Sequence, residues 1–174
     1  LDQDRDLFVA QTTPTLGAAN SGPKVGPIVI SEIYYHPPDF RGPHEVFDNV
    51  RDEYIELQNT GGTAVPLYDP SNPVNTWRLR DAVDFTFPPG TTIPAAGYLL
   101  LVGFNPADAE LLAAFRQANG VPIETPIYGP WTGKLDNSQD SVELLRPDLP
   151  VPPGYPDAGR VSYILVDKVN YQDT

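Results

Sequence analysis

A chain of 174 residues, 40% of them hydrophobic, is long enough to bury one core and too apolar to be a wholly disordered tail. Its formal net charge of −12, with no run of lysine or arginine, repels phosphate backbones, so we expect no nucleic acid partner. The 21 prolines disfavour long helices, and the absence of cysteine excludes disulfides, thiol catalysis and thiolate metal sites.

The sequence also indicates the kind of protein to which this chain belongs and its relation to membranes. It contains no methionine, so we expect a processed or excised piece of a longer parent protein. No apolar run is long enough to span a membrane, so we expect no membrane insertion of this segment. An export signal would then lie in another part of the parent.

The first half begins with an irregular stretch. Residues 1–26 mix Asp, Gln, Thr, Gly and Pro without periodicity, which indicates a linker or loosely ordered arm ahead of a domain over 27–174. The β-branched and aromatic run at 28–35 predicts the first strand, which ends at two prolines. The acidic stretch 39–52 predicts a long loop, and loops of this length often carry function.

The following segments predict further strands. Alternation over 54–59 predicts a half-buried antiparallel strand, with Ile55 and Leu57 on one face and a turn at 59–62. The continuous apolar run at 97–103 is typical of a strand covered on both faces. Other strands are predicted at 64–67, 77–80, 84–87, 141–145 and 161–171. Seven or eight short strands favour an all-β fold, a two-sheet β-sandwich.

One inserted helix is predicted at about 105–119. Asn105 can cap it, Pro106 suits the first helical position, and Gly120 ends it. Its apolar face consists of Leu111, Leu112, Phe115 and Ala118.

The order of these motifs resembles the lamin tail domain family over about 27–173. The matching motifs are IVISEIYY, DEYIELQNTGGTAVPL, WRLR, DFTFPPGTTIPAAGYLLLV, GKLDNSQDSVELL and VDKVNY. The resemblance implies an immunoglobulin-like sandwich. The acidic insert after Pro38, the negative charge and the absence of a heptad rod resemble the bacterial branch, whose members are secreted or envelope-associated. The chromatin binding of nuclear members uses basic surface, which this chain lacks.

The carboxylates of Asp52, Glu53 and Glu56 are candidates for acid and base catalysis, which needs them to converge on a substrate. Along a strand, neighbouring side chains point to opposite faces, so Glu53 and Glu56 are expected to diverge. The favoured interpretation is a solvated face.

Two histidines lie at the ends of a possible metal-binding stretch. His36 and His44 accompany Asp39, Glu45 and Asp48, a set of residue types that binds transition metals. Their spacing matches no closed motif, so exposed loop residues are the favoured interpretation.

Residues 136–140 have oxygen-bearing side chains that resemble part of a calcium loop. The central Gly and terminal bidentate Glu of an EF-hand are absent. A tight turn in which Asp136 and its neighbours bond backbone amides is favoured instead. Ser138 and Ser141 are interpreted as turn and strand residues, because no nucleophile elbow is present.

The two tryptophans give opposite expectations. Trp77 is expected in the sandwich core, whereas Trp131, in a loop between Pro130 and Gly133, is the better candidate for an exposed stacking platform, with Tyr128 nearby.

We therefore expect a non-catalytic structural or protein-interaction module with no assigned catalytic, cofactor or metal residue. Its expected partners are other domains of the parent or another protein, in the extracellular space or cell envelope, and the chain is expected to be a monomer or weak dimer. Calcium- or glycan-dependent binding through Trp131, Tyr128 or 136–140 is the alternative. A hydrolase using Glu53 or His44 is the least favoured hypothesis.

Overall fold

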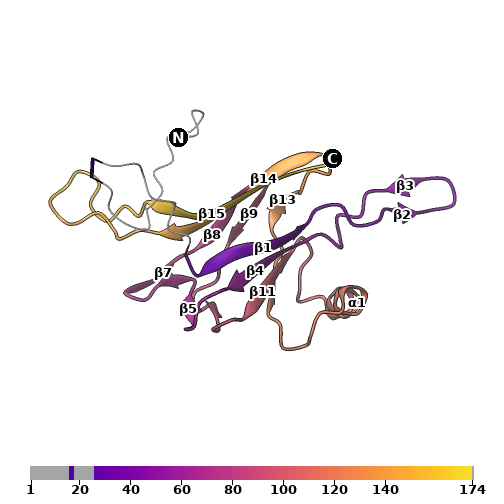
Figure 1. Cartoon of the computed structure of the whole chain (residues 1–174), viewed down its shortest axis with the longest axis horizontal. Helices are drawn as coiled ribbons and strands as arrows, with labels where there is room; N and C mark the ends of the chain where they lie inside the picture. The colour runs from indigo at the N-terminus through magenta and orange to yellow at the C-terminus, as the bar shows by residue number, and fades with distance from the viewer. Residues whose placement is uncertain (1–15, 18–25, 174) are drawn as a thin grey trace.

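The computed structural model describes residues 16–17 and 26–173. Within these residues it shows two packed β-sheets and one short helix (Figure 1). The predicted all-β sandwich is therefore confirmed. Nearly all of the linker predicted at 1–26 lies outside the described residues. No helix in the described part is long and apolar enough to cross a membrane.

The first sheet has four strands in the order β1-β4-β11-β12. Its strands β1, β4 and β11 are antiparallel, and β12 is parallel to β11. The bounds are β1 Ile28–Tyr34, β4 Tyr54–Asn59, β11 Tyr98–Val102 and β12 Ile127–Tyr128.

The second sheet has five strands in the order β13-β9-β8-β14-β15, all antiparallel to their neighbours. The bounds are β8 Arg78–Asp81, β9 Val83–Thr86, β13 Thr132–Gly133, β14 Gln139–Pro147 and β15 Tyr163–Gln172. Three small two-stranded ladders complete the strands: β2 Phe40–Arg41 with β3 Val46–Phe47, β5 Val65–Pro66 with β10 Thr92–Ile93, and β6 Tyr68–Asp69 with β7 Asn72–Thr76.

The apolar run of β11 serves two cores at once. Leu99 and Leu101 point into the core between the sheets, whereas Leu100 and Val102 point toward the helix. Alternation of side chains along a strand explains this division, and it confirms the prediction of a strand covered on both faces.

The helix α1, Ala109–Asn119, begins later than the sequence predicted. Asp108, not Asn105, is the N-cap, and its carboxylate accepts hydrogen bonds from the amides of Glu110 and Leu111. Asn105 instead accepts a hydrogen bond from the Ala107 amide, in a turn ahead of the helix. The helix ends at Gly120, which has the left-handed conformation with φ 65°, as predicted.

The acidic loop predicted at 39–52 contains a hairpin that the sequence did not reveal. Strands β2 and β3 pair Phe40 with Phe47 and Arg41 with Val46. We call residues 40–47 the arm. Figure 1 shows the arm projecting from the body of the sandwich, on the same side as α1.

The edge strands of the two sheets meet on one side of the sandwich. The Ile30 amide of β1 donates a hydrogen bond of 2.8 Å to the Asp167 carboxylate of β15. Both strands carry a register shift close to this contact. A side chain that occupies an edge amide reduces the tendency of an edge strand to pair with another chain.

Candidate functional site

Glu53 and Glu56 lie on opposite sides of the first sheet. Glu56 is on the outer face, where it accepts a hydrogen bond of 2.7 Å from the Ser31 hydroxyl. Glu53 is on the inner side and only 1% exposed. The predicted divergence is confirmed, but the interpretation of Glu53 as a solvated residue is wrong. The segment that precedes β4 continues its alternation, which turns Glu53 inward with Ile55.

The carboxyl group of Glu53 is incompletely hydrogen-bonded. The backbone amide of Leu135 donates to it, while its Oε1 atom is buried without a hydrogen-bond partner among the described residues. Loss of hydration raises the pKa of Glu53 to about 7. The Leu135 hydrogen bond opposes this rise, the charge of Asp48 adds to it, and the charge of Lys134 opposes it.

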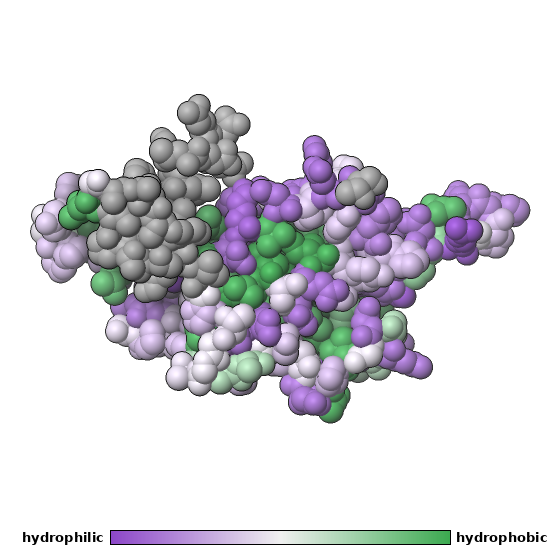
Figure 2. Space-filling view, in the orientation of Figure 1, coloured by the Kyte–Doolittle hydropathy of each residue, from purple (hydrophilic) through white to green (hydrophobic). Residues whose placement is uncertain are grey.

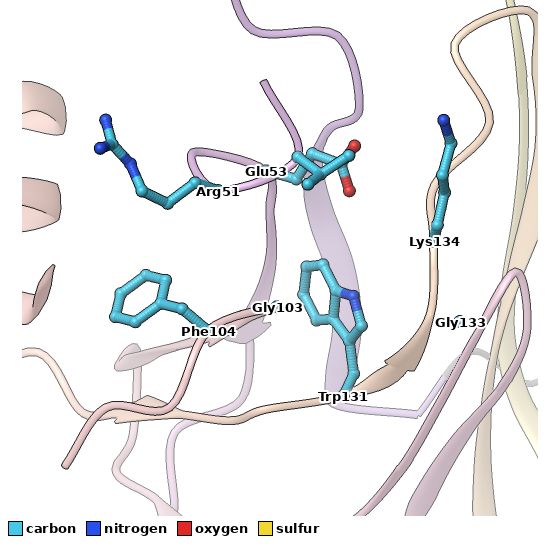
Figure 3. A pocket seen from close by; sticks show the side chains of 8 residues that line it. Arg51, Glu53, Gly103, Phe104, Trp131, Gly133 and Lys134 are labelled. Atoms are coloured by element: carbon cyan, nitrogen blue, oxygen red, sulfur yellow. The ribbon is translucent and has the colours of Figure 1, made fainter. Parts of the chain in front are cut away.

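Glu53 lies in a pocket of about 370 Å³, which we call the Glu53 pocket. Figure 3 shows its carboxyl group beside the indole of Trp131, with Phe104 on one side and Lys134 on the other. The complete lining is Val50, Arg51, Glu53, Gly103, Phe104, Trp131, Gly133 and Lys134. The loop before β4, the end of β11 and the segment around β13 therefore converge here.

The cations of the pocket are paired outside it. Arg51 Nε is 3.0 Å from the Asp52 carboxylate, and Lys134 Nζ is 2.7 Å from that of Asp48. Hydrogen bonds from Lys134 and Asn137 hold the pKa of Asp48 below its usual value. Since each pair is neutral overall, Glu53 determines the net charge of the pocket.

Trp131 is buried, with 6% of its surface exposed, so the expectation of an exposed stacking platform is wrong. Its amide donates to the Val102 carbonyl, and its indole packs against Gly103. A Cβ atom at Gly103 would lie 3.2 Å from Trp131 Nε1, so the glycine makes room for the ring. Trp77 is in the core between the sheets, as predicted.

The histidines do not meet at one site. His36 Nδ1 lies 3.9 Å from the Asp173 carboxylate, and His44 is an exposed residue of the arm. Across the described part of the chain, no three His, Cys, Asp or Glu residues are grouped so as to hold a metal ion.

Residues 136–138 form the predicted turn, and Gln139 and Asp140 begin β14. Asp136 Oδ1 accepts hydrogen bonds from the Ser138 amide and hydroxyl and from the Gln139 amide. These bonds hold the pKa of Asp136 below its usual value. Ser141 is a strand residue of β14 that donates to the Asp81 carboxylate, and the Ser138 hydroxyl donates to Asp136.

Sequence reasoning did not identify the Glu53 pocket. The alternation that places Ile55 and Leu57 inward also applies to Glu53, so the sequence pattern predicts its burial. No sequence pattern predicts that Gly103, Phe104 and Lys134 line the same pocket, because this depends on contacts between segments distant in the sequence.

The sequence model of the Lamin Tail Domain family matches residues 21–172. The match covers most of the chain and both sheets. Among curated proteins, none matches the sequence.

Proposed function

Since the chain belongs to the lamin tail domain family of immunoglobulin-like modules, we propose that it is a non-catalytic module that uses its arm to bind another protein. The observation that carries this proposal is the exposure of large apolar side chains on the arm. Val46 is 64% exposed, Phe47 is 52% exposed and Phe40 is 38% exposed. Phe40 and Phe47 form a cross-strand pair on one face of the hairpin, and Val46 lies on the other face. Exposed apolar side chains on a projecting hairpin are typical of interaction sites.

The arm is adjacent to the Glu53 pocket. Arg51, which lines the pocket, has its guanidinium 4.6 Å from the centre of the Phe40 ring. Val50, also in the lining, is 44% exposed. In Figure 2 the arm shows green hydrophobic surface among purple hydrophilic residues. The arm and the pocket thus meet at Arg51, so one partner can contact both.

The charge of the chain favours a basic partner. The formal net charge is −12, and Asp39, Glu45 and Asp48 lie in or beside the arm, with Arg41 as its basic residue. Opposite charge on a partner would accelerate association and select against acidic competitors. We propose a domain of the parent protein, or another protein, that presents apolar residues together with lysine or arginine.

The setting that we propose is the exterior or envelope of a bacterial cell, as part of a larger exported protein. The acidic insert at 39–52 and the negative charge support this setting, because both resemble bacterial members of the family. Cell fractionation with an antibody against the domain tests it. Recovery in the cytoplasmic fraction alone would contradict it.

A paired-variant binding experiment tests the role of the arm. The Val46→Ser/Phe47→Ser variant should lose proteins that the wild-type chain retains on a column, because it removes the exposed apolar side chains of the arm. The matched control is Leu149→Ser/Tyr155→Ser, which changes two side chains that are 76% and 65% exposed in another loop. Equal retention by both variants would contradict the proposal.

Calcium-dependent binding at 136–140 is the alternative hypothesis with a definite test. Asp136 Oδ1 accepts three hydrogen bonds within its turn, and among the described residues no three His, Cys, Asp or Glu side chains are grouped so as to hold an ion. We therefore expect no rise in melting temperature when millimolar calcium replaces a chelator. A rise that Asp136→Asn abolishes would establish a calcium site there.

A further inference from the structure

We propose that the Glu53 pocket binds the ammonium group of a lysine side chain that the partner inserts, with the Glu53 carboxylate as its counter-ion. This inference rests on the proposed function, since it names the group of the partner that is recognised. It is also separate from the arm in its residues and in its test.

The first reason is the buried oxygen without a partner. Glu53 is 1% exposed, and its Oε1 atom has no hydrogen-bond partner among the described residues. Figure 3 shows the carboxyl group in the pocket beside Trp131. A buried acceptor that lacks a donor is costly, so a donor from a ligand would gain more here than at an exposed carboxylate.

The second reason is that only one oxygen of the Glu53 carboxyl group lacks a hydrogen-bond donor. The Leu135 amide already donates to the carboxyl group, and Oε1 is its buried acceptor without a donor among the described residues. An arginine binds carboxylates best through two parallel hydrogen bonds, which require both oxygens. A lysine ammonium is a compact charge that needs only one of them. The pocket therefore fits lysine better than arginine.

The third reason is the apolar wall. Trp131 and Phe104 are 6% and 8% exposed, and both line the pocket. The four methylene groups of a lysine can lie along these rings while the head group reaches Glu53. Aromatic rings also attract cations through their negative faces. A volume of about 370 Å³ is sufficient for one such side chain.

The fourth reason is the charge balance. Arg51 is paired with Asp52, and Lys134 is paired with Asp48. When Glu53 is ionised, these residues together carry one net negative charge, which a single ammonium group neutralises. An anionic ligand would instead face a buried carboxylate at close range.

A titration with n-butylammonium, which has the alkyl stem and head group of lysine, tests the proposal in the intact chain. Binding is followed by the NMR signal of the Trp131 indole N–H, and the Trp77 signal serves as an internal reference because that ring is in the core. We expect a saturable shift with n-butylammonium and none with 1-butanol or butyrate. Equal binding of 1-butanol would overturn the role of the charge.

Variants and pH extend the test. Glu53→Gln should weaken n-butylammonium binding by at least about tenfold, whereas Glu56→Gln on the opposite face should leave it unchanged. Binding to the wild-type chain should weaken as pH falls from 8 to 6, because protonation removes the counter-ion. Unchanged affinity in Glu53→Gln, or the absence of a pH effect, would overturn the proposal even if the variants differ in stability.

The two proposals can fail separately. Val46→Ser/Phe47→Ser should lose the partner and still bind n-butylammonium, because both residues lie outside the pocket lining. No n-butylammonium binding by a chain that retains its partner would refute the lysine site alone. If the arm variant retains the partner and still binds n-butylammonium, only the proposal that the arm binds the partner is refuted.

Discussion

The carboxyl group of Glu53 links the stability of this domain to pH. Its pKa is about 7 in the folded chain, against 4.5 for an unperturbed glutamate, because burial disfavours the charged form. A raised acid pKa means that the folded state binds the proton more tightly than the unfolded state. The contribution of Glu53 to stability therefore falls as pH rises from about 4.5 to about 7, by about 3 kcal/mol.

Replacing Glu53 by glutamine should remove this penalty. We expect Glu53→Gln to be more stable than the wild-type chain at pH 8, and its advantage to grow by about 2 kcal/mol between pH 5 and pH 8. Urea denaturation at the two pH values measures the effect, with Glu56→Gln as the control. A Glu53→Gln advantage that is the same at both pH values would show that Glu53 is not the titrating group.

Gly133 occupies a position where a side chain is poorly tolerated. Its φ is +94°, and an added Cβ would lie 2.5 Å from the Ala82 carbonyl oxygen. Gly133→Ala should therefore destabilise the chain by about 2 kcal/mol or more. Gly62→Ala is the matched control, because nothing lies within 4 Å of its added Cβ. Thermal unfolding compares the two, and equal melting temperatures would contradict the close approach.

Burial of single residues is most predictable where periodicity extends to them. Leu57 and Ile55 were assigned inward by alternation, and the same rule, applied one step further, would have buried Glu53. Trp131 could not be assigned in this way, since its neighbours are Pro130 and Thr132 in an irregular segment. Its burial depends on Gly103, which is distant in the sequence.

At the scale of elements, the N-terminus of α1 offers a test between two caps. Asp108 caps the helix with two hydrogen bonds, so Asp108→Ala should lower the free energy of unfolding by about 1 kcal/mol. Asn105→Ala removes one hydrogen bond in the preceding turn and should cost less. Chemical denaturation of both variants measures the difference. A larger loss in Asn105→Ala would restore the helix start predicted at 105.

Elements with strong patterns were predictable, and short ones were not. Strand β11 has a continuous apolar run, and β4 alternates through its whole length, so the hydrophobic pattern of the sequence predicts both. The arm has strands of two residues with exposed side chains, and no burial pattern marks it. The start of α1 was missed because Asn105 and Asp108 are both good caps. The apolar face that follows Asp108 decides between them.

At the scale of the whole molecule, charge and edge protection oppose self-association. The net charge is −12, and the edge strands β1 and β15 are joined through Ile30 and Asp167. We expect a monomer at micromolar concentration, with weak association that increases when salt screens the charges. Light scattering at low and high salt measures this. A tight dimer at micromolar concentration would contradict the expectation.

Photo-crosslinking in the cell that makes the protein tests the central claim most directly. A photoreactive amino acid at Phe47, which is 52% exposed on the arm, should give a discrete cross-linked product with one protein. The same amino acid at Tyr155, which is 65% exposed in another loop, should give none. Cross-linking at Tyr155 but not at Phe47, or at neither position, would contradict a module that binds its partner through the arm.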